Sequence, residues 1–531
     1  MTKLGKFAET IFVRTYAATY DETWEMCARR VADFVAGDDY KELADEFYEA
    51  ISTRRFMPGG RYLAQCGKEI PQLTNCFLLR ADDSREGWSQ LLYKHMMALS
   101  TGGGVGTYYG DVRQSGLPIK RFGGVSSGPI SLMSMVNETA RHVLAGGKRR
   151  SALWAGLPWN HGDIEKFIQA KDWTTQARAM KEADFNFPAP LDMTNISVCL
   201  DDEFFEKVKT DDKVKDLYYR ICKNMCKTGE PGFSIDLGRN AKDKLRNPCT
   251  EVVSATDSDC CNLGSINLAR IADITELKKL TRLAVKFLYL GTFRSWMPHE
   301  SFAAIREKDR RIGLGIMGLH EWCMRRGERY EPNGELGKWL SAWANISDDE
   351  AVKFSKGKGS KPVAVRAIAP TGTIGIIAET TTGIEPVYCV AYKRRYLTQN
   401  GGSEVEYVVD PTVKRLIDEG IIKDPNDVED SIKMARHVDR RIRMQAFVQS
   451  FVDQGISSTI NMPEYGEPGN NNVKQFSETL LEYLPKLRGI TVYPDGARAG
   501  QPITAVRWET AIKHAKVEEP EDKCAQGACG I

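Results

Sequence analysis

The sequence of 531 residues contains no apolar run long enough to cross a bilayer. Its first residues, MTKLGKFAETIFVRTYAATYDET, lack the apolar core of a signal peptide. A formal net charge of +2 excludes the broad basic field of a nucleic-acid-binding protein, and there is no acidic tail. We found no internal repeat and no low-complexity tract. We therefore expect a cytoplasmic protein that binds no membrane and makes no direct contact with nucleic acid.

The residues that are present indicate a soluble globular protein. The hydrophobic fraction is 42% and the charged fraction is 27%, both ordinary values for this class. The length allows several domains or one large α/β unit with additions. The 13 cysteines are scattered and lack the spacing of a small disulfide-rich domain, which indicates reduced thiols with a few redox-active ones.

Hydrophobic periodicity divides the chain into helical and mixed regions. Residues 8–60 carry aromatic and apolar side chains at helical spacing and predict a helical layer. Cys76 begins an apolar run that predicts a strand, followed by a helix whose N-cap is Asp83 or Ser84. Taken alone, Cys76 is more typical of a core thiol than of a reactive one.

The second half of the chain is predicted to be mostly helical. Residues 270–350 have helical spacing, and the glycines in Arg310–Cys323 indicate close helix packing. Residues 425–485 are helical apart from SSTINMPEY, and Arg488–Gly500 predicts a last strand and turn. The polar segment 172–184 has the composition of a mobile loop.

The stretch Arg246–Asn267, RNPCTEVVSATDSDCCNLGSIN, is the candidate centre of the chemistry. Asn247, Cys249 and Glu251 alternate, so in extended backbone their side chains would share one face. Such an amide, thiol and carboxylate would suit a hydroxylated substrate. Pro248 lacks an amide hydrogen, which places the segment at an end, an edge or a loop. The alternative interpretation is a buried free cysteine in a loop with ordinary polar neighbours.

Two further stretches are candidates for phosphate binding. Ser100–Gly116, STGGGVGTYYGDVRQSG, is a glycine-rich loop through which backbone amides could approach a ligand, although it matches neither a Walker loop nor a dinucleotide fingerprint. In Val365–Tyr388, an apolar strand runs into Pro370-Thr371-Gly372-Thr373, and an apolar segment follows. Hydroxyls and free amides at a strand-to-helix turn make an anion site, with a simple turn as the alternative.

The chain ends EDKCAQGACGI, which places Cys524 and Cys529 close together in a polar terminus. This is the composition of a mobile dithiol arm. Two cysteines without a histidine or a second pair make a poor zinc site, so no metal site is expected.

The ordered set of motifs resembles the catalytic subunit of ribonucleotide reductases, and most of all the adenosylcobalamin-dependent class II enzymes. The motifs are FMPGGR, NCF, GGGVG with DVR, GGKRRSA with HGDIEKFI, NISV, NPCTE, CNLGSINL, RRIGLGIMGL, APTGTIGIIAETTTGIEP, ITVYPDG and the cysteine tail. The resemblance implies a ten-stranded α/β barrel of two half-barrels with a central finger loop. It implies an N-terminal helical layer over 1–60 without an ATP cone, a barrel over 61–500 and a redox tail over 501–531. Without the cone, we expect no overall on/off switch by ATP and dATP.

The resemblance also implies roles for individual residues. Cys249 would become a thiyl radical that removes the 3′ hydrogen of a ribonucleoside di- or triphosphate, Glu251 would act as base on the 3′ hydroxyl, and Asn247 would hold the substrate. Cys76 and Cys261 would be the dithiol that is oxidised to a disulfide. Cys524 and Cys529 would then reduce that disulfide, and thioredoxin or a similar donor would reduce the tail.

The binding sites follow from the same resemblance. The substrate would contact Asn75, Gly104, Pro370, Thr371, Gly372, Thr373 and Ile374. A deoxynucleotide effector would bind at Asp83, Ser84, Arg113 and Lys120, and the loop near 172–190 would relay its identity to the substrate base. Members of the family are usually homodimers, although monomers occur.

The cofactor is inferred from one local departure. Class I catalytic subunits receive a radical from a metal-containing partner subunit through two adjacent tyrosines, whereas here Tyr493 precedes Pro494. Proline cannot carry the radical, so we expect adenosylcobalamin as the cofactor. A class I catalytic subunit is the alternative, and the CAQGAC spacing of the tail favours it. A catalytically inactive nucleotide-binding relative is a third possibility. Thr250 stands where the family usually has glycine.

Overall fold

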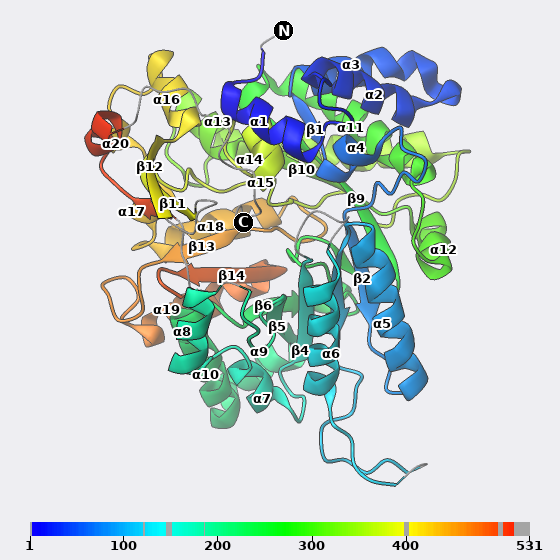
Figure 1. The fold of residues 1–531 in the computed structure, drawn as a ribbon, viewed down its shortest axis with the longest axis vertical. Coiled ribbons are helices and arrows are strands. Elements are labelled where there is room, and N and C mark those ends of the chain that lie inside the picture. Colours follow the sequence, from blue (N-terminus) through cyan, green and yellow to red (C-terminus); the bar gives the residue numbers. More distant parts are fainter. Residues whose placement is uncertain are drawn as a thin grey trace.

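The computed structural model describes residues 3–120, 123–144, 151–184, 186–397, 403–497 and 503–514. The N-terminal layer consists of α1 (Lys6–Thr15), α2 (Trp24–Ala36) and α3 (Ala44–Ser52), blue in Figure 1. The Thr23 hydroxyl caps α2 by accepting the Met26 amide, as expected for an N-cap threonine. The predicted helical layer is confirmed. Phe47 packs edge-on against Phe287, with ring centroids 5.2 Å apart, and this contact seats the layer on α11 (Ile274–Arg294).

Five parallel strands form one half of the main sheet. They are β2 (Cys76–Arg80), β3 (Gly104–Tyr108), β4 (Leu153–Pro158), β5 (Thr194–Asp201) and β6 (Gly232–Asp236). Successive side chains along a strand point to opposite faces of the sheet. Phe77 and Leu79 therefore belong to a core cluster shared with the helices, whereas Cys76 and Leu78 belong to a second cluster on the opposite face. The covering helices, around the lower half of Figure 1, include α5 (Arg85–Ser100), α6 (Pro129–His142) and α10 (Asp212–Thr228).

The other half of the sheet joins this one at two antiparallel junctions. Strand β14 (Gly489–Pro494) pairs with β6, and β9 (Asp259–Asn267) pairs with β2. Strand β13 (Thr459–Met462) then runs parallel to β14, and β10 (Ile312–Met317) runs parallel to β9. Strand β1 (Phe56–Pro58) adds to β9 and completes a ten-stranded sheet.

The ten strands of the expected barrel do not form a sheet that is hydrogen-bonded all the way round. The sheet path is open between β10 and β13. The irregular segment 364–369 lies in this gap: the Leu314 amide donates to the Val365 carbonyl at 2.8 Å, and the Ser457 amide donates to the Ile368 carbonyl at 2.8 Å. Within this segment, Ile368 forms an isolated parallel β-bridge with Ile456. The two ends of the sheet are therefore connected by an extended segment, without a full tenth ladder.

Three local predictions are corrected by the structure. Residues 312–317 within Arg310–Cys323 form the buried strand β10, so their glycines serve strand packing. Residues 104–108 of the glycine-rich stretch form strand β3, so the centre of the expected loop is a strand. The polar segment 172–184 contains helix α8 (Thr175–Ala183), whose Lys181 is buried and pairs with Asp192 at 2.5 Å. This ion pair fixes a segment whose composition indicates mobility.

A small three-stranded sheet lies beside the main one. It contains β11 (Ala391–Leu397), β12 (Ser403–Val409) and β15 (Ile503–Ala505), and α16 (Pro411–Asp418) and α20 (Trp508–His514) accompany it. Residues 503–514, assigned to the tail from the sequence, therefore form a strand and a helix.

The remaining helices are α4 (Gly60–Gln65), α7 (Ile164–Gln169), α9 (Asp202–Thr210), α12 (Glu300–Asp309), α13 (Leu319–Arg325), α14 (Gly334–Ser355), α15 (Gly372–Ala378), α17 (Ser431–Met434), α18 (Val438–Gln449) and α19 (Val473–Tyr483). Among the helices of the described ranges, none has the length and apolar character needed to span a membrane.

Candidate active site

The candidate catalytic residues lie on a short hairpin loop. Strands β7 (Leu245–Arg246) and β8 (Val253–Ser254) pair, and residues 247–252 connect them. The Thr250 amide donates to the Asn247 carbonyl at 3.0 Å, and the Val252 amide donates to Asn247 Oδ1 at 2.9 Å. The loop expected from Pro248 is confirmed, and the extended backbone considered for residues 247–251 is not adopted, because residues 248–250 turn and Thr250 has a left-handed φ of 66°. We call residues 246–252 the finger loop.

Glycines on neighbouring strands give the finger loop its room. A Cβ at Gly106 would lie 1.7 Å from the Arg246 carbonyl oxygen, and one at Gly104 would lie 2.9 Å from Pro248 Cγ. On the other side, the Gly455 amide donates to the Glu251 carbonyl at 2.7 Å. Two glycines of the stretch considered for phosphate binding thus allow the close approach of the finger loop.

A buried ion pair fixes the base of the finger loop. The Arg246 side chain is fully buried, and its Nη2 lies 2.5 Å from Asp236 Oδ1 on β6. The same guanidinium donates to the backbone carbonyls of Ile235 and Arg488, each at 3.3 Å. A buried charge pair with these added hydrogen bonds holds the loop against β6 and the residue preceding β14.

Cys76 and Cys261 lie directly opposite each other. They are paired residues in the antiparallel ladder of β2 and β9, and both are buried free thiols. Directly opposed residues in such a ladder have Cα atoms about 4.5–5.5 Å apart, within the range of a disulfide. Burial raises the pKa of each thiol well above its ordinary value, so both remain protonated near neutral pH.

Asn247 connects this thiol pair to the finger loop. Its Nδ2 donates to Cys76 Sγ at 3.0 Å. After burial, the charges of Glu251, Cys249 and Cys261 raise the pKa of Cys76 further, which shows that these groups lie close together. The structure thus brings together all five residues that were named as catalytic from the sequence.

Glu251 has the electrostatic character of a general base. Burial raises the pKa of its carboxyl from 4.5 to about 7, while hydrogen bonding with Asn247 and the backbone opposes this rise. Its Oε2 is buried and has no hydrogen-bond partner within the described ranges. An orphaned carboxylate oxygen with a pKa near neutrality is suited to accept a proton from a bound hydroxyl.

Cys249 differs from the other two thiols because its side chain is exposed. Surrounding protein atoms nevertheless raise the pKa of its thiol, and the Glu251 charge adds to this effect. Solvent therefore reaches this thiol although protein atoms crowd it. Asn195 on β5 is also exposed and donates from Nδ2 to the Pro248 carbonyl at 3.1 Å. Asn195 was not predicted as a site residue, although it begins the NISV motif.

The predicted phosphate turn follows a segment that packs beside the buried thiol pair. Ala367 and Ala369 share one buried cluster with Cys76 and Cys261, and the chain then enters the turn at Pro370. Thr371 adopts a left-handed φ of 52°, and its Oγ1 accepts the Gly383 amide at 2.8 Å. Pro370 is exposed and Gly372 and Thr373 are partly exposed, so the amides in the first turn of α15 are accessible.

The other predicted substrate residues border the thiol pair. The Asn75 amide donates to the Cys261 carbonyl at 3.2 Å, and the Gly104 amide donates to the Asn75 carbonyl at 3.0 Å. Gly104 is also the register partner of Cys76. Asn75 and Gly104 therefore lie at the edge of the site.

The structure joins three of the four predicted effector residues. Arg113 Nε lies 2.7 Å from Asp83 Oδ2, and Ser84 caps α5 by accepting the Gly87 amide at 2.9 Å. The predicted N-cap at Asp83 or Ser84 is thus Ser84. Lys120 is exposed on the following loop and makes no contact with the other three among the described interactions.

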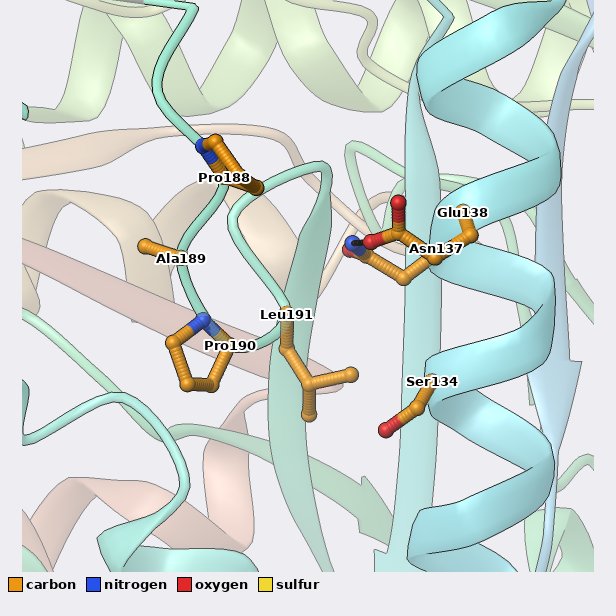
Figure 2. Close-up of a pocket in the computed structure, with 7 residues that line it drawn as sticks. All are labelled: Ser134, Asn137, Glu138, Pro188, Ala189, Pro190 and Leu191. Carbon is orange, nitrogen blue, oxygen red and sulfur yellow. Dashed lines mark hydrogen bonds between the residues drawn. The ribbon is translucent and has the colours of Figure 1, made fainter.

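A small cavity of about 160 Å³ separates α6 from the segment after α8. In Figure 2, Ser134, Asn137 and Glu138 line it from α6, and residues 188–191 line it from the opposite side. Asn137 Oδ1 accepts the Thr194 hydroxyl at 2.9 Å, and Thr194 precedes the Asn195 that contacts the finger loop. This is a covalent and hydrogen-bonded route from α6 to Pro248.

The predicted tail residues Cys524 and Cys529 lie outside the described residues.

Comparison with known proteins identifies the family. The model of the ribonucleotide reductase barrel domain matches residues 74–215, 211–337 and 341–493, and that of the all-alpha domain matches residues 2–71. The chain belongs to the ribonucleotide reductase family. The resemblance inferred from the motifs is therefore confirmed.

Curated relatives and a solved structure agree with this family. The vitamin B12-dependent ribonucleoside-diphosphate reductase of Mycobacterium tuberculosis is 27% identical over 97% of this chain and 81% of the relative. The protein of the same name from Thermoplasma acidophilum is 27% identical over 90% of this chain and 68% of the relative. The class Id ribonucleotide reductase alpha subunit of Actinobacillus ureae matches with a TM-score of 0.72 at 18% identity, covering 93% of this chain and 97% of that one. This last similarity shows the shared fold.

Proposed function

We propose that this protein reduces ribonucleotides to 2′-deoxyribonucleotides, with Cys249, Glu251, Asn247, Cys76 and Cys261 as the catalytic residues. The observation that carries the proposal is the register pair Cys76 and Cys261, connected through the Asn247 side chain to the loop of Cys249 and Glu251. A reductant pair, a base and a reachable thiol then share one site.

The proposed reaction gives each group a distinct task. The thiyl form of Cys249 takes the 3′ hydrogen from the ribose, while Glu251 accepts the proton of the 3′ hydroxyl. The 2′ hydroxyl leaves as water with a proton from one thiol of the dithiol, and C2′ takes a hydrogen from the other, so that Cys76 and Cys261 together supply two electrons and become a disulfide. Glu251 then returns its proton to the 3′ oxygen, and Cys249 returns the hydrogen to C3′ and becomes the thiyl radical again. The raised pKa of the two buried thiols supports this role, because protonated thiols can donate.

Adenosylcobalamin is the proposed cofactor, supported by the vitamin B12-dependent relatives. When bound, it supplies an organic radical that can oxidise a thiol. The residue arrangement fits this role, because Cys249 is the exposed thiol while Cys76 and Cys261 are buried.

The substrate and electron donor are assigned by the same proposal. The turn Pro370–Ile374 binds the substrate phosphates, and Asn75 and Gly104 border the ribose. The tail cysteines Cys524 and Cys529 reduce the Cys76–Cys261 disulfide, with thioredoxin or a similar dithiol as donor. A deoxynucleotide effector binds near Asp83, Ser84, Arg113 and Lys120, and the protein acts in the cytoplasm as a homodimer. The route from α6 through Thr194 to Pro248 supports transmission of effector identity.

A turnover assay with purified protein, adenosylcobalamin, a dithiol and no second protein tests the proposal. We expect deoxyribonucleotide from CDP, and CTP in parallel determines whether triphosphates are also used. Product that requires a metal-containing partner protein would instead support the class I alternative. Nucleotide binding without product under both conditions would contradict the proposed function.

A further inference from the structure

Helix α15 ends among three arginines that come from distant parts of the chain. Arg54 Nη1 donates to the Ile377 carbonyl at 3.4 Å, Arg270 Nη2 to the Ala378 carbonyl at 3.3 Å, and Arg415 Nη2 to the Glu379 carbonyl at 3.0 Å. Arg54 follows the N-terminal helical layer, Arg270 follows β9, and Arg415 lies on α16. These three side chains are called the arginine clamp below.

The clamp is built at a structural cost. Arg54 is fully buried and has a left-handed φ of 58°. Burial, together with the charges of Arg54 and Arg415, lowers the pKa of Arg270 to about 10, so the three like charges lie close together. Residues in such conformations persist where the surrounding structure holds them in place.

Acidic groups and the helix end offset these charges. Glu379 Oε2 lies 2.5 Å from Arg54 Nη1, and Glu379 Oε1 accepts the Gly5 amide at 2.9 Å. The carbonyls at a helix C-terminus carry partial negative charge, which favours cations at this end. The N-terminal layer, β9 and α16 are thus all tied to the last turn of α15.

The consequence lies at the opposite end of the helix. Seven residues at 1.5 Å each make α15 about 10 Å long, so a fixed C-terminal end also fixes the turn at its start. That turn, Pro370–Ile374, is the proposed phosphate site. The positive charge of the clamp also lies within roughly one Debye length of a phosphate bound there.

We infer that the arginine clamp positions the phosphate turn from behind, and that it determines affinity for the phosphate group of the nucleotide without touching it. Arg54, Arg270 and Arg415 are positioning residues in this account. The inference rests on the proposed function, because it assumes that the turn Pro370–Ile374 receives a nucleotide phosphate.

The chain offers a closely matched control for Arg415. Arg415 pairs with Glu321 at 2.8 Å and with Glu419 at 3.2 Å. Arg325 pairs with the same two carboxylates at 2.9 Å and 2.8 Å. Of the two, Arg415 donates to the end of α15. Replacing each by methionine therefore removes the same ion pairs and separates the effect on α15.

The test compares dissociation constants of CDP and of cytidine for the wild type, Arg415→Met, Arg325→Met and Arg415→Lys. We expect Arg415→Met to weaken CDP binding at least fivefold and to change cytidine binding less than twofold. Arg325→Met should stay within twofold of the wild type for both ligands. Arg415→Lys should recover part of the CDP affinity, because an ammonium group can still donate to the Glu379 carbonyl.

Equal effects of Arg415→Met and Arg325→Met on CDP binding would overturn the proposed role of the arginine clamp. An equal loss of affinity for CDP and for cytidine in Arg415→Met would do the same. A lower melting temperature with unchanged CDP affinity would also overturn it, because it would mean a purely structural role. The binding readout is independent of turnover. A wild type that binds CDP and forms no deoxynucleotide would contradict the proposed function. The CDP dissociation constants of the variants would still test the role of the arginine clamp.

Discussion

At the scale of single residues, the main feature of the site is that its three thiols differ in solvent exposure. Of its three cysteines, Cys249 is exposed, whereas Cys76 and Cys261 are buried and face each other. Its carboxylate, Glu251, has a buried oxygen with no hydrogen-bond partner in the part of the chain that the structure describes. A thiol that can be reached, two thiols kept protonated and a base near neutral pKa are separate requirements of one reaction. Burial meets the last two requirements, and the exposure of Cys249 meets the first.

The raised pKa of Glu251 gives a prediction with a defined sign. The folded state holds this proton up to a pH of about 7, whereas the unfolded chain releases it near 4.5. Folding is therefore favoured by this group below pH 4.5, and that contribution is lost as pH rises through about 7. The difference corresponds to about 3 kcal/mol.

Glu251→Gln removes this titration. We expect the variant to be more stable than the wild type at pH 8 by up to about 3 kcal/mol in its free energy of unfolding, with the difference shrinking toward pH 4.5. We also expect kcat to fall at least about 100-fold, the usual loss of a general base. Denaturant titrations across this pH range measure the first effect, and the exposed Glu206→Gln is the control. A difference in stability that does not change with pH would show that Glu251 is not a buried titrating group.

At the scale of elements, the finger loop depends on neighbours that lack side chains. Gly106 on β3 and Gly455 before β13 both leave room for its backbone. Arg246 ties its base to β6. Thr250, in a left-handed conformation usually taken by glycine, is held within this frame. The loop is thus positioned by packing from several strands, and its own sequence specifies little of its shape.

Gly106→Ala tests this packing. The new Cβ would lie 1.7 Å from the Arg246 carbonyl oxygen, so the finger loop must move. A displacement of about 1 Å in a reacting group costs on the order of 100-fold in rate, and we expect a loss of that size in kcat/KM. Gly334→Ala is the control, because an added Cβ there would have open space around it among the described residues. Activity measured alongside thermal unfolding separates the two effects, and a fully active Gly106→Ala would refute the packing argument.

The sequence predicted those features that depend on local patterns. The helix start at Ser84, the N-terminal helices and the strand beginning at Cys76 all follow from capping and periodicity. Pro248 indicated an end, an edge or a loop, but the turn at residues 248–250 was not predicted. It depends on hydrogen bonds of Asn247 and on packing against Gly106, which is distant in the sequence. Likewise, β10 and α8 were missed: the glycines of β10 lie against β9 and residue 367, and the buried pair of Lys181 and Asp192 overrides a polar composition.

At the scale of the whole molecule, the two sets of strands give the site its position. Antiparallel junctions at β2–β9 and β6–β14 join them, and the first of these places Cys76 opposite Cys261. The segment 364–369 links the remaining ends and continues into the proposed phosphate turn. A substrate at that turn would therefore lie beside the finger loop, and the arginine clamp would connect it to the N-terminal layer. The order of motifs identified the family, but closure of the sheet by an irregular segment required the structure.

The central claim is that Cys249 removes the hydrogen from the ribose C3′, and 3′-deuterated CDP tests it most directly. With the wild type, adenosylcobalamin and a dithiol, we expect slower reduction of the deuterated nucleotide than of the ordinary one. Cys249→Ser should form no deoxynucleotide from either while still binding CDP. Continued reduction by Cys249→Ser, with the same isotope effect, would contradict the account.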